Sequence, residues 1–331
     1  MRLGFVGAGA IARRHVEVLG GHPDAVVAAV CDAQTEVAGA MAAATGATAY
    51  TDWEAMFEAE PLDGVFVCTP PAVHLGPARA AFECGVSVYL EKPLARSLDD
   101  GEAIVEAWRT SGVLCAVGYQ WRSVDLLDRL RTELGGAPPG LVVSRSLGPT
   151  ERGRAGQWFG DARESGGILF ELGSHDIDLQ RAIAGRVTAV QAASAAGLLA
   201  TAADGAPALD DAVAIVMHFA GGGLGVVALG WTEAQDPAVY SLDVMAGDVA
   251  LRLDDLDPGF RLHGRARGAE VDVTAADDPR RSSIARFLDA VAGGGQAVVP
   301  CSPEDALGTL RVALAAERAV ATDVTVDVSG G

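Results

Sequence analysis

The stretch LGFVGAGAIA, Leu3 to Ala12, starts as a short apolar run and continues directly into a glycine-rich turn. The run is typical of a buried strand, and Gly7, Gly9 and Ala12 then follow the spacing GxGxxA. In this pattern the first glycine permits a tight turn, the second lets a ligand approach the backbone, and the small third residue keeps helix and strand close. Amides at the start of the following helix attract phosphate groups. The stretch therefore predicts a Rossmann unit that binds a dinucleotide through Gly7, Gly9, Ala10, Ile11 and Ala12.

Asp32 predicts which dinucleotide binds. It ends the second apolar run, Val26–Cys31, about 20 residues beyond the glycine turn, where a carboxylate accepts hydrogen bonds from ribose hydroxyls. The same carboxylate repels a 2′-phosphate, and Ala33 and Gln34 bring no arginine to neutralise one. NAD is therefore expected in preference to NADP. A helix N-cap role for Asp32 is compatible with the same position.

The length of 331 residues and the order of patterns predict two domains. In the first third, strand patterns alternate with helical patterns, which is typical of an α/β doubly wound parallel sheet. After about residue 118, strand patterns follow one another without helices, which favours a mostly antiparallel sheet in an α+β domain. We expect a Rossmann domain over residues 1–118 and a substrate-binding and oligomerisation domain over 119–331.

Composition excludes several classes of protein. The net charge of −19 opposes binding to nucleic acid or to anionic membranes. Apolar runs are far shorter than the ~20 residues of a membrane span, and no leader precedes the first strand, so a cytoplasmic protein is expected. The five cysteines include no CxxC pair and are expected to be free thiols, with no metal site.

The fifth strand pattern ends in Glu91-Lys92-Pro93-Leu94. Lys92 is the only lysine among 25 lysines and arginines, in a chain that otherwise uses arginine for every side-chain cation. An ammonium and a guanidinium differ in geometry and in how readily they lose a proton. Carboxyl ends of parallel strands face the ligand crevice, so Glu91 and Lys92 are expected to point there.

A second polar cluster, Glu171, His175 and Asp178, lies in GGILFELGSHDIDL within one amphipathic helix expected over about residues 168–184. Spacings of four and three residues place the three on one helical face. Histidine exchanges protons near neutral pH, and a neighbouring carboxylate orients its ring. The alternative is a solvated helix face; a metal site lacks a further ligand.

Five motifs occur in order: GAGAIA at 7–12, CTPPAVH at 68–74, EKPL at 91–94, GYQWR at 118–122 and GxHxxD at 173–178. Together they resemble the glucose–fructose oxidoreductase/inositol dehydrogenase/MocA family across nearly the whole chain. The resemblance implies an NAD(P)-dependent dehydrogenase acting on a secondary alcohol or ketone of a sugar, a cyclitol or a derivative. It also implies an open-faced C-terminal sheet that builds homodimers or homotetramers.

The resemblance assigns Lys92 as the catalytic lysine and His175 as the acid/base histidine, with Asp178 at the last motif position. Glu171 stands where the family commonly has aspartate. Beside the glycine turn and Asp32, the expected cofactor contacts are Thr69, Pro70, His74, Glu91, Lys92 and Gln120. The expected substrate contacts are Lys92, Arg122, Trp158, Glu171 and His175.

Alternatives stay open at this point. His74 could cap the next helix, Arg122 could pair with a carboxylate, and Trp158 could simply pack. His15 and the other histidines outside the motifs are assigned to core or surface. At the level of function, the alternatives are an NAD-dependent redox-assisted glycoside hydrolase and a non-enzymatic dinucleotide sensor.

Overall fold

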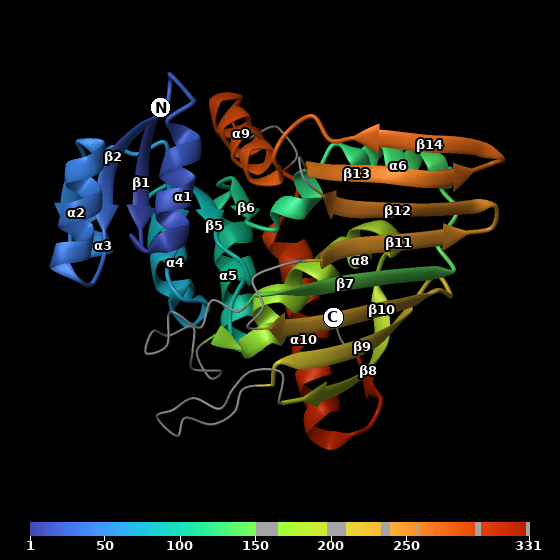
Figure 1. The fold of residues 1–331 in the computed structure, drawn as a ribbon. Helices are drawn as coiled ribbons and strands as arrows, with labels where there is room; N and C mark the ends of the chain where they lie inside the picture. Colours follow the sequence, from blue (N-terminus) through green and yellow to red (C-terminus); the bar gives the residue numbers. More distant parts are fainter. Residues whose placement is uncertain (150–164, 197–209, 233–238, 257–258, 295–298, 329–331) are drawn as a thin grey trace. The chain divides into compact units, whose positions relative to one another are not determined.

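The computed structural model describes residues 1–149, 165–196, 210–232, 239–256, 259–294 and 299–328. The chain forms two compact units. The first contains Met1–Ser123 and Pro279–Leu307, and the second contains Val124–Asp278 and Gly308–Gly331. Figure 1 shows the elements of both.

The first unit contains a six-stranded parallel sheet in the order β3-β2-β1-β4-β5-β6. Its strands are β1 Arg2–Val6, β2 Val26–Cys31, β3 Thr48–Tyr50, β4 Gly64–Val67, β5 Ser87–Leu90 and β6 Cys115–Val117. Its helices in this part of the chain are α1 Ala10–Leu19, α2 Thr35–Thr45, α3 Trp53–Ala59, α4 Leu75–Glu83 and α5 Leu98–Ser111. The strand order reverses between β1 and β4, which is where doubly wound sheets bind ligands. The predicted parallel sheet is confirmed.

Helix α9, Pro279–Ala292, returns from the last third of the chain to complete the core of this unit. Its Phe287 packs edge-on against Phe66 and Tyr89, and its Ser283 hydroxyl lies 3.0 Å from the Tyr89 hydroxyl. The division therefore differs from the expected boundary between residues 118 and 119. A helix distant in sequence supplies apolar surface that the N-terminal strands bury.

The second unit contains a nine-stranded sheet in the order β14-β13-β12-β11-β7-β10-β9-β8-β15. The strands are β7 Leu141–Pro149, β8 Val187–Ala195, β9 Ala212–Phe219, β10 Leu224–Thr232, β11 Val239–Ala246, β12 Val249–Leu256, β13 Gly259–Ala266, β14 Ala269–Thr274 and β15 Val326–Asp327. Only β7 and β10 pair in parallel among these described strands; the other pairs are antiparallel. The predicted mostly antiparallel sheet is confirmed.

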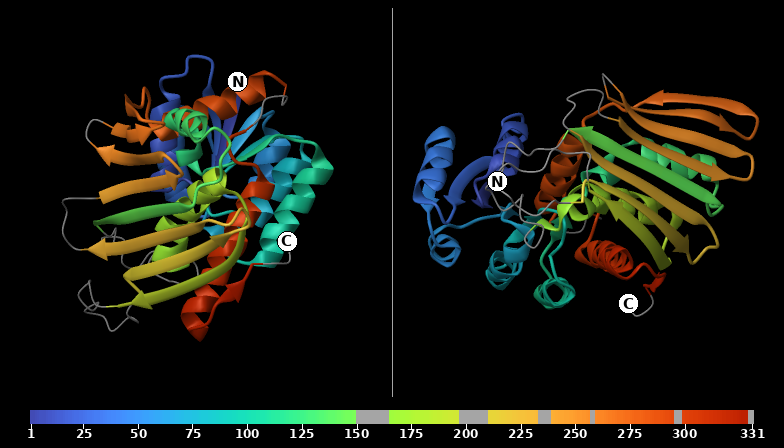
Figure 2. Two further views of the ribbon diagram at one scale, coloured as in Figure 1. Left: turned by 90° about the vertical axis from the view of Figure 1, so that its right-hand side faces the viewer. Right: turned by 60° about the horizontal axis from the view of Figure 1, so that its bottom comes forward.

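Helices lie along one face of this sheet, and Figure 2 shows its other face without a helix in the part of the chain that is described. The helices are α6 Leu126–Leu134, α8 Ser174–Ala184 and, from Gly308 onward, α10 Pro303–Thr322. Along β9 the burial alternates residue by residue, as expected of a sheet with one packed face.

Four strands were not anticipated from the sequence: β3, β13, β14 and β15. Strands β3 and β15 are short, and β13 and β14 carry many charged residues. The charges lie on one face: Arg261 and His263 of β13 stand opposite Thr274 and Asp272 of β14, while Leu262 is buried. Period-two alternation with charged outer residues is a weaker strand signal than a continuous apolar run.

No helix among the described residues is both long and apolar enough to cross a membrane.

Candidate active site

The glycine turn after β1 forms a cradle at the start of α1. Gly7 has a φ of 89°, and a Cβ there would lie 2.7 Å from the Cys68 carbonyl, so only glycine fits. The space where a Cβ of Gly9 would lie is open to 4 Å. Helix α1 then begins at Ala10 with no side-chain cap and no acidic residue in its first turn. Free amides and open space at a helix N-terminus fit a pyrophosphate.

Asp32 braces this cradle. Its Oδ2 accepts a hydrogen bond from the Ala8 amide at 2.9 Å, and its Oδ1 accepts one from the Gln34 amide at 3.0 Å. Helix α2 begins at Thr35 and has no side-chain cap, so the N-cap alternative does not describe Asp32. The carboxylate is half-buried and each oxygen keeps a second lone pair, so it can also accept ribose hydroxyls.

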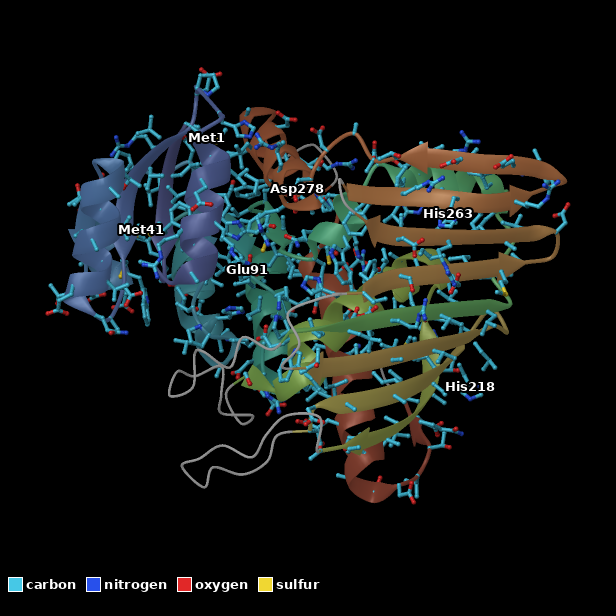
Figure 3. The ribbon with its side chains drawn as sticks, viewed as in Figure 1. Met1, Met41, Glu91, His218, His263 and Asp278 are labelled. Carbon is cyan, nitrogen blue, oxygen red and sulfur yellow. The ribbon has the colours of Figure 1, made fainter. Side chains whose placement is uncertain are left out.

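Glu91 lies against α1 and not in the crevice that the sequence suggested. Its side chain, labelled in Figure 3, is buried, and its Oε1 lies 2.6 Å from His15 Nε2. Its Oε2 accepts a hydrogen bond from the Lys92 amide at 3.1 Å. Lys92 is half-buried, and the Lys92–Pro93 peptide bond is cis. Glu91 therefore binds the backbone of Lys92. Its buried side chain differs from the cofactor contact expected from the sequence.

Burial by itself would raise the pKa of Glu91. The hydrogen bond from His15, with the nearby Lys92 ammonium and amide, outweighs burial and holds the pKa of Glu91 below its ordinary value. Glu91 is thus an ionised carboxylate inside the protein at neutral pH. Its oxygens also pack on Gly118, where a Cβ would lie 3.2 Å from Oε1.

His74 contacts the loop that follows β4. Its ring is fully buried, with Nε2 2.9 Å from the Thr69 carbonyl and Nδ1 3.2 Å from the Leu94 carbonyl. Burial lowers the pKa of His74, although both carbonyls and the charge of Glu91 oppose the shift. Since the ring has no exposed edge, His74 differs from the expected cofactor contact: it orders the loop on which Thr69 and Pro70 lie.

Thr69 and Pro70 are half-buried just beyond β4, at the carboxyl end of the sheet. Gln120 is half-buried at the start of the 3₁₀ turn Gln120–Ser123, beyond β6. These three positions remain accessible at the edge of the sheet where the ligand crevice was expected.

Arg122 lies 3.3 Å from the Asp305 carboxylate and 3.4 Å from the Pro300 carbonyl, which fits the alternative that it pairs with a carboxylate.

The second cluster lies on a helix with an irregular start. A π-helical turn covers Leu169–Gly173 and leads directly into α8. A Cβ on Gly173 would lie 2.8 Å from a Leu229 methyl group, so glycine lets this turn approach β10. Wide turns of this kind are frequent at functional sites. The single amphipathic α-helix expected here is therefore interrupted between Glu171 and His175.

The three residues of this cluster differ in exposure. Glu171 and His175 are half-buried, whereas Asp178 is almost fully buried. Asp178 Oδ1 accepts a hydrogen bond from Thr309 of α10 at 2.9 Å, and Thr309 in turn accepts one from Arg181 at 2.6 Å. Asp178 thus ties α8 to α10, and only Glu171 and His175 keep accessible surface.

A buried carboxyl next to His175 escaped the sequence analysis. Asp176 has no exposed surface and accepts a hydrogen bond from Ser146 of β7 at 2.7 Å. Burial raises the pKa of Asp176 to about 7, against the opposing hydrogen bonds of Ser146 and Ser144. Gln180 donates to Ser144 at 2.9 Å in the same cluster. The signal in the sequence was a pair of serines, Ser144 and Ser146, at alternate positions of a strand pattern, which indicates a buried polar partner.

His15 is a second buried polar residue whose partner the sequence did not reveal. It was assigned to core or surface, and it is indeed buried, but as the partner of Glu91. Its spacing from Ala12 and Leu19 places it on the buried face of α1. A histidine among apolar positions on the helix that follows a dinucleotide turn was the missed signal.

The cysteines, a metal site and Trp158 were the remaining expectations. All five cysteines are free thiols, and four of them are buried. Among the described residues, no cluster of three or more His, Cys, Asp or Glu side chains could hold a metal ion. Trp158 lies outside the described residues.

Comparison with known proteins gives the family. A model of the GFO/IDH/MocA oxidoreductase family, with an NAD-binding Rossmann fold, matches residues 1–119. A model of the GFO/IDH/MocA C-terminal domain matches residues 141–265. The chain belongs to the GFO/IDH/MocA oxidoreductase family. The expected family and an NAD(P)-dependent oxidoreductase are thereby confirmed.

Relatives of this GFO/IDH/MocA protein span its full length. Uncharacterized oxidoreductase YrbE of Bacillus subtilis is 26% identical over 98% of this chain and 96% of that protein. Inositol 2-dehydrogenase of Rhizobium meliloti is 25% identical, over 97% of each chain. The structure of the WlbA dehydrogenase from Bordetella pertussis, in complex with NADH and UDP-GlcNAcA, has the same fold. It covers 100% of this chain and 99% of its own, with a TM-score of 0.81 at 22% identity.

Proposed function

We propose that this GFO/IDH/MocA protein transfers hydride between NAD and a secondary alcohol or ketone of a sugar, a cyclitol or a derivative. One observation carries the proposal: the only lysine of the chain follows β5 at the carboxyl end of the sheet that bears the glycine cradle. The names of relatives, which include inositol 2-dehydrogenase and D-apiose dehydrogenase, support the substrate class.

Lys92 and His175 are the proposed acid/base and polarising pair. When bound, the nicotinamide supplies the hydride acceptor. His175 removes the hydroxyl proton of the substrate, since imidazole is the usual general base among side chains and His175 keeps accessible surface. Lys92 donates a hydrogen bond to the same oxygen and stabilises its developing negative charge. Glu171, one turn before His175, contacts the substrate, and Asp178 holds the helix.

NAD is the proposed cofactor, in preference to NADP, because the Asp32 carboxylate stands beside the cradle. Gly7, Gly9, Ala10, Ile11 and Ala12 would hold the pyrophosphate, and Thr69, Pro70 and Gln120 would border the remainder. Calorimetry with NAD and NADP tests this preference. Asp32→Asn removes the negative charge, and we expect its affinity ratio for NAD over NADP to fall at least tenfold. An unchanged ratio would contradict the role of Asp32.

The reaction is tested by NADH absorbance across inositols, aldoses, uronates and nucleotide sugars. On the substrate so identified, Lys92→Ala and His175→Ala should each lower kcat by about 10² to 10⁴, the usual contribution of such groups. His22→Ala, in the loop after α1, is the matched control and should keep wild-type turnover. Near-normal turnover of both site variants would sink the assignment; tight NAD binding with no NADH from any substrate would favour a sensor.

A second copy of this chain is the proposed partner, docked on the face of the nine-stranded sheet where the described residues form no helix. Leu224 of β10 and Met245 of β11 both stand beside Leu141 of β7 on this face, and they are 40% and 45% exposed. Ion pairs such as Arg252–Asp243 cover the other half of the face, where His263 is labelled in Figure 3. An apolar patch with a charged border suits a self-complementary interface. Light scattering should give two or four times the chain mass.

A further inference from the structure

The backbone before Lys92 is tied to α1 through two buried side chains. His15 is 1% exposed and Glu91 is 7% exposed. A carboxylate only accepts hydrogen bonds, so His15 donates from Nε2 across the 2.6 Å to Oε1. The other oxygen of Glu91 accepts the Lys92 amide at 3.1 Å. One continuous chain of hydrogen bonds thus runs from α1 to the lysine.

Neither member of this pair has room to turn. The His15 ring packs against Phe66 and Tyr89, with centroids 5.6 and 5.5 Å away. The Glu91 carboxylate is confined from the opposite side by Gly118. A buried charge held in this way keeps one orientation, because rotating it away from its donors would leave it unsolvated.

His74 ties down the backbone that follows the lysine. Its two ring nitrogens lie 3.2 Å from the Leu94 carbonyl and 2.9 Å from the Thr69 carbonyl. Leu94 comes two residues after Lys92, and Thr69 is on the loop after the neighbouring strand β4. Carbonyls only accept hydrogen bonds, and the neutral ring that burial favours carries one N–H, so His74 donates to one of these two carbonyls and packs against the other. The turn of Lys92 thus lies between two buried histidines, with His15 reaching the residue before it and His74 the backbone after it.

We propose that His15 and His74 are positioning residues that fix the turn bearing Lys92, and thereby fix where the ammonium is presented. The inference deepens the proposed function and rests on the role given there to Lys92. The competing explanation is that both rings merely fill the core. A core filler is replaced by leucine with effects on stability alone, whereas loss of a positioning residue lowers turnover in protein that is still folded.

Steady-state kinetics separate the two explanations. In folded His15→Leu we expect kcat to fall about tenfold to a hundredfold, the scale of a small misplacement of a catalytic group, with KM for NAD changed less than twofold. His15→Gln keeps an N–H donor and should recover part of the loss. His74→Leu should lower kcat on the same scale and also raise KM for NAD, because His74 lies against the loop that bears Thr69 and Pro70. His22→Gln, in the loop after α1, is the control.

A second readout uses the single lysine. Reductive methylation with ¹³C-formaldehyde labels Lys92 as the one side-chain dimethylamine of the chain, and its NMR signal is assigned by its absence in Lys92→Arg. The signal should move or broaden in His15→Leu and His74→Leu, return toward wild type in His15→Gln, and stay unchanged in His22→Gln. This readout needs neither substrate nor turnover.

The outcomes are distinguishable. Unchanged kcat and an unchanged lysine signal in folded His15→Leu and His74→Leu would overturn the positioning role. If His15→Leu does not fold, His74→Leu decides: a lowered kcat and a moved lysine signal in that folded variant support the positioning role, and wild-type values of both overturn it. A shifted signal together with normal turnover of Lys92→Ala would overturn the proposed function and leave the positioning of Lys92 standing.

Discussion

Two buried carboxyl groups, one in each unit, each lie next to a candidate catalytic residue in sequence, and their pKa values are shifted in opposite directions. Glu91 precedes Lys92 in the parallel-sheet unit, and its pKa is held below the ordinary value. Asp176 follows His175 in the nine-stranded unit, and its pKa is raised to about 7. Both are removed from solvent, so burial pushes both pKa values upward.

The partners make the difference. Glu91 has the Nε2–H of His15, the Lys92 amide and a nearby ammonium, all of which favour the charged form. Asp176 has only burial and the serine hydroxyls of β7 acting on its pKa, and no cation among the described residues. Neutral hydroxyls compensate less of the cost of burying a charge. The first unit thus keeps a fixed charge beside its lysine, whereas the second keeps a carboxyl that titrates near neutral pH beside its histidine.

The largest expected effect comes from removing the partner of Glu91. A lowered folded pKa contributes stability that is present above the ordinary value of 4.5 and is lost as pH falls through the folded pKa. His15→Leu should therefore lower the free energy of unfolding by about 3 to 5 kcal/mol at pH 8, with a smaller loss at acid pH, where a protonated Glu91 needs no partner. Urea unfolding at both pH values measures this. A loss that does not depend on pH would break the comparison; His22→Leu is the control.

The next effect should appear at Asp176, with the opposite pH dependence. A raised folded pKa contributes stability that is full below the ordinary value of 3.8 and is lost as pH rises toward about 7. Asp176→Asn can still accept from Ser146, and its stability relative to wild type should rise by a few kcal/mol between pH 4 and pH 8. The exposed Asp248→Asn should show no such trend. A flat difference for Asp176→Asn would show that Asp176 remains charged throughout.

The smallest expected effect sharpens the role of the hydroxyls. Ser146→Ala removes the 2.7 Å hydrogen bond to Asp176 and should cost about 1 kcal/mol. The same change should raise the pKa of Asp176 further, because the lost hydrogen bond favours the charged form. The stability difference from wild type should then be greatest at high pH. Ser194→Ala, at a half-buried position in β8, provides the baseline, and equal effects of the two variants would contradict the assignment.

The sequence by itself determined the fold class of both units and the positions of the main candidate residues, because these depend on local patterns. The turn at Gly7 requires a positive φ, and apolar runs followed by helical periodicity describe βαβ units within tens of residues. Lys92, at the end of a strand pattern, and His175, in its motif, were located in the same way. The runs of strands after residue 118 likewise gave the mostly antiparallel sheet.

Only the tertiary structure decided the features that depend on distant pairs and on burial. His15 and Glu91 are 76 positions apart, Thr309 and Asp178 are 131 apart, and α9 joins a core built by the first third of the chain. No local pattern encodes such contacts, since either partner alone is compatible with many environments. The same holds for the ionisation of Glu91 and Asp176, because burial and partners distant in sequence, His15 for Glu91 and Ser146 for Asp176, dominate the pKa shifts of these carboxyls.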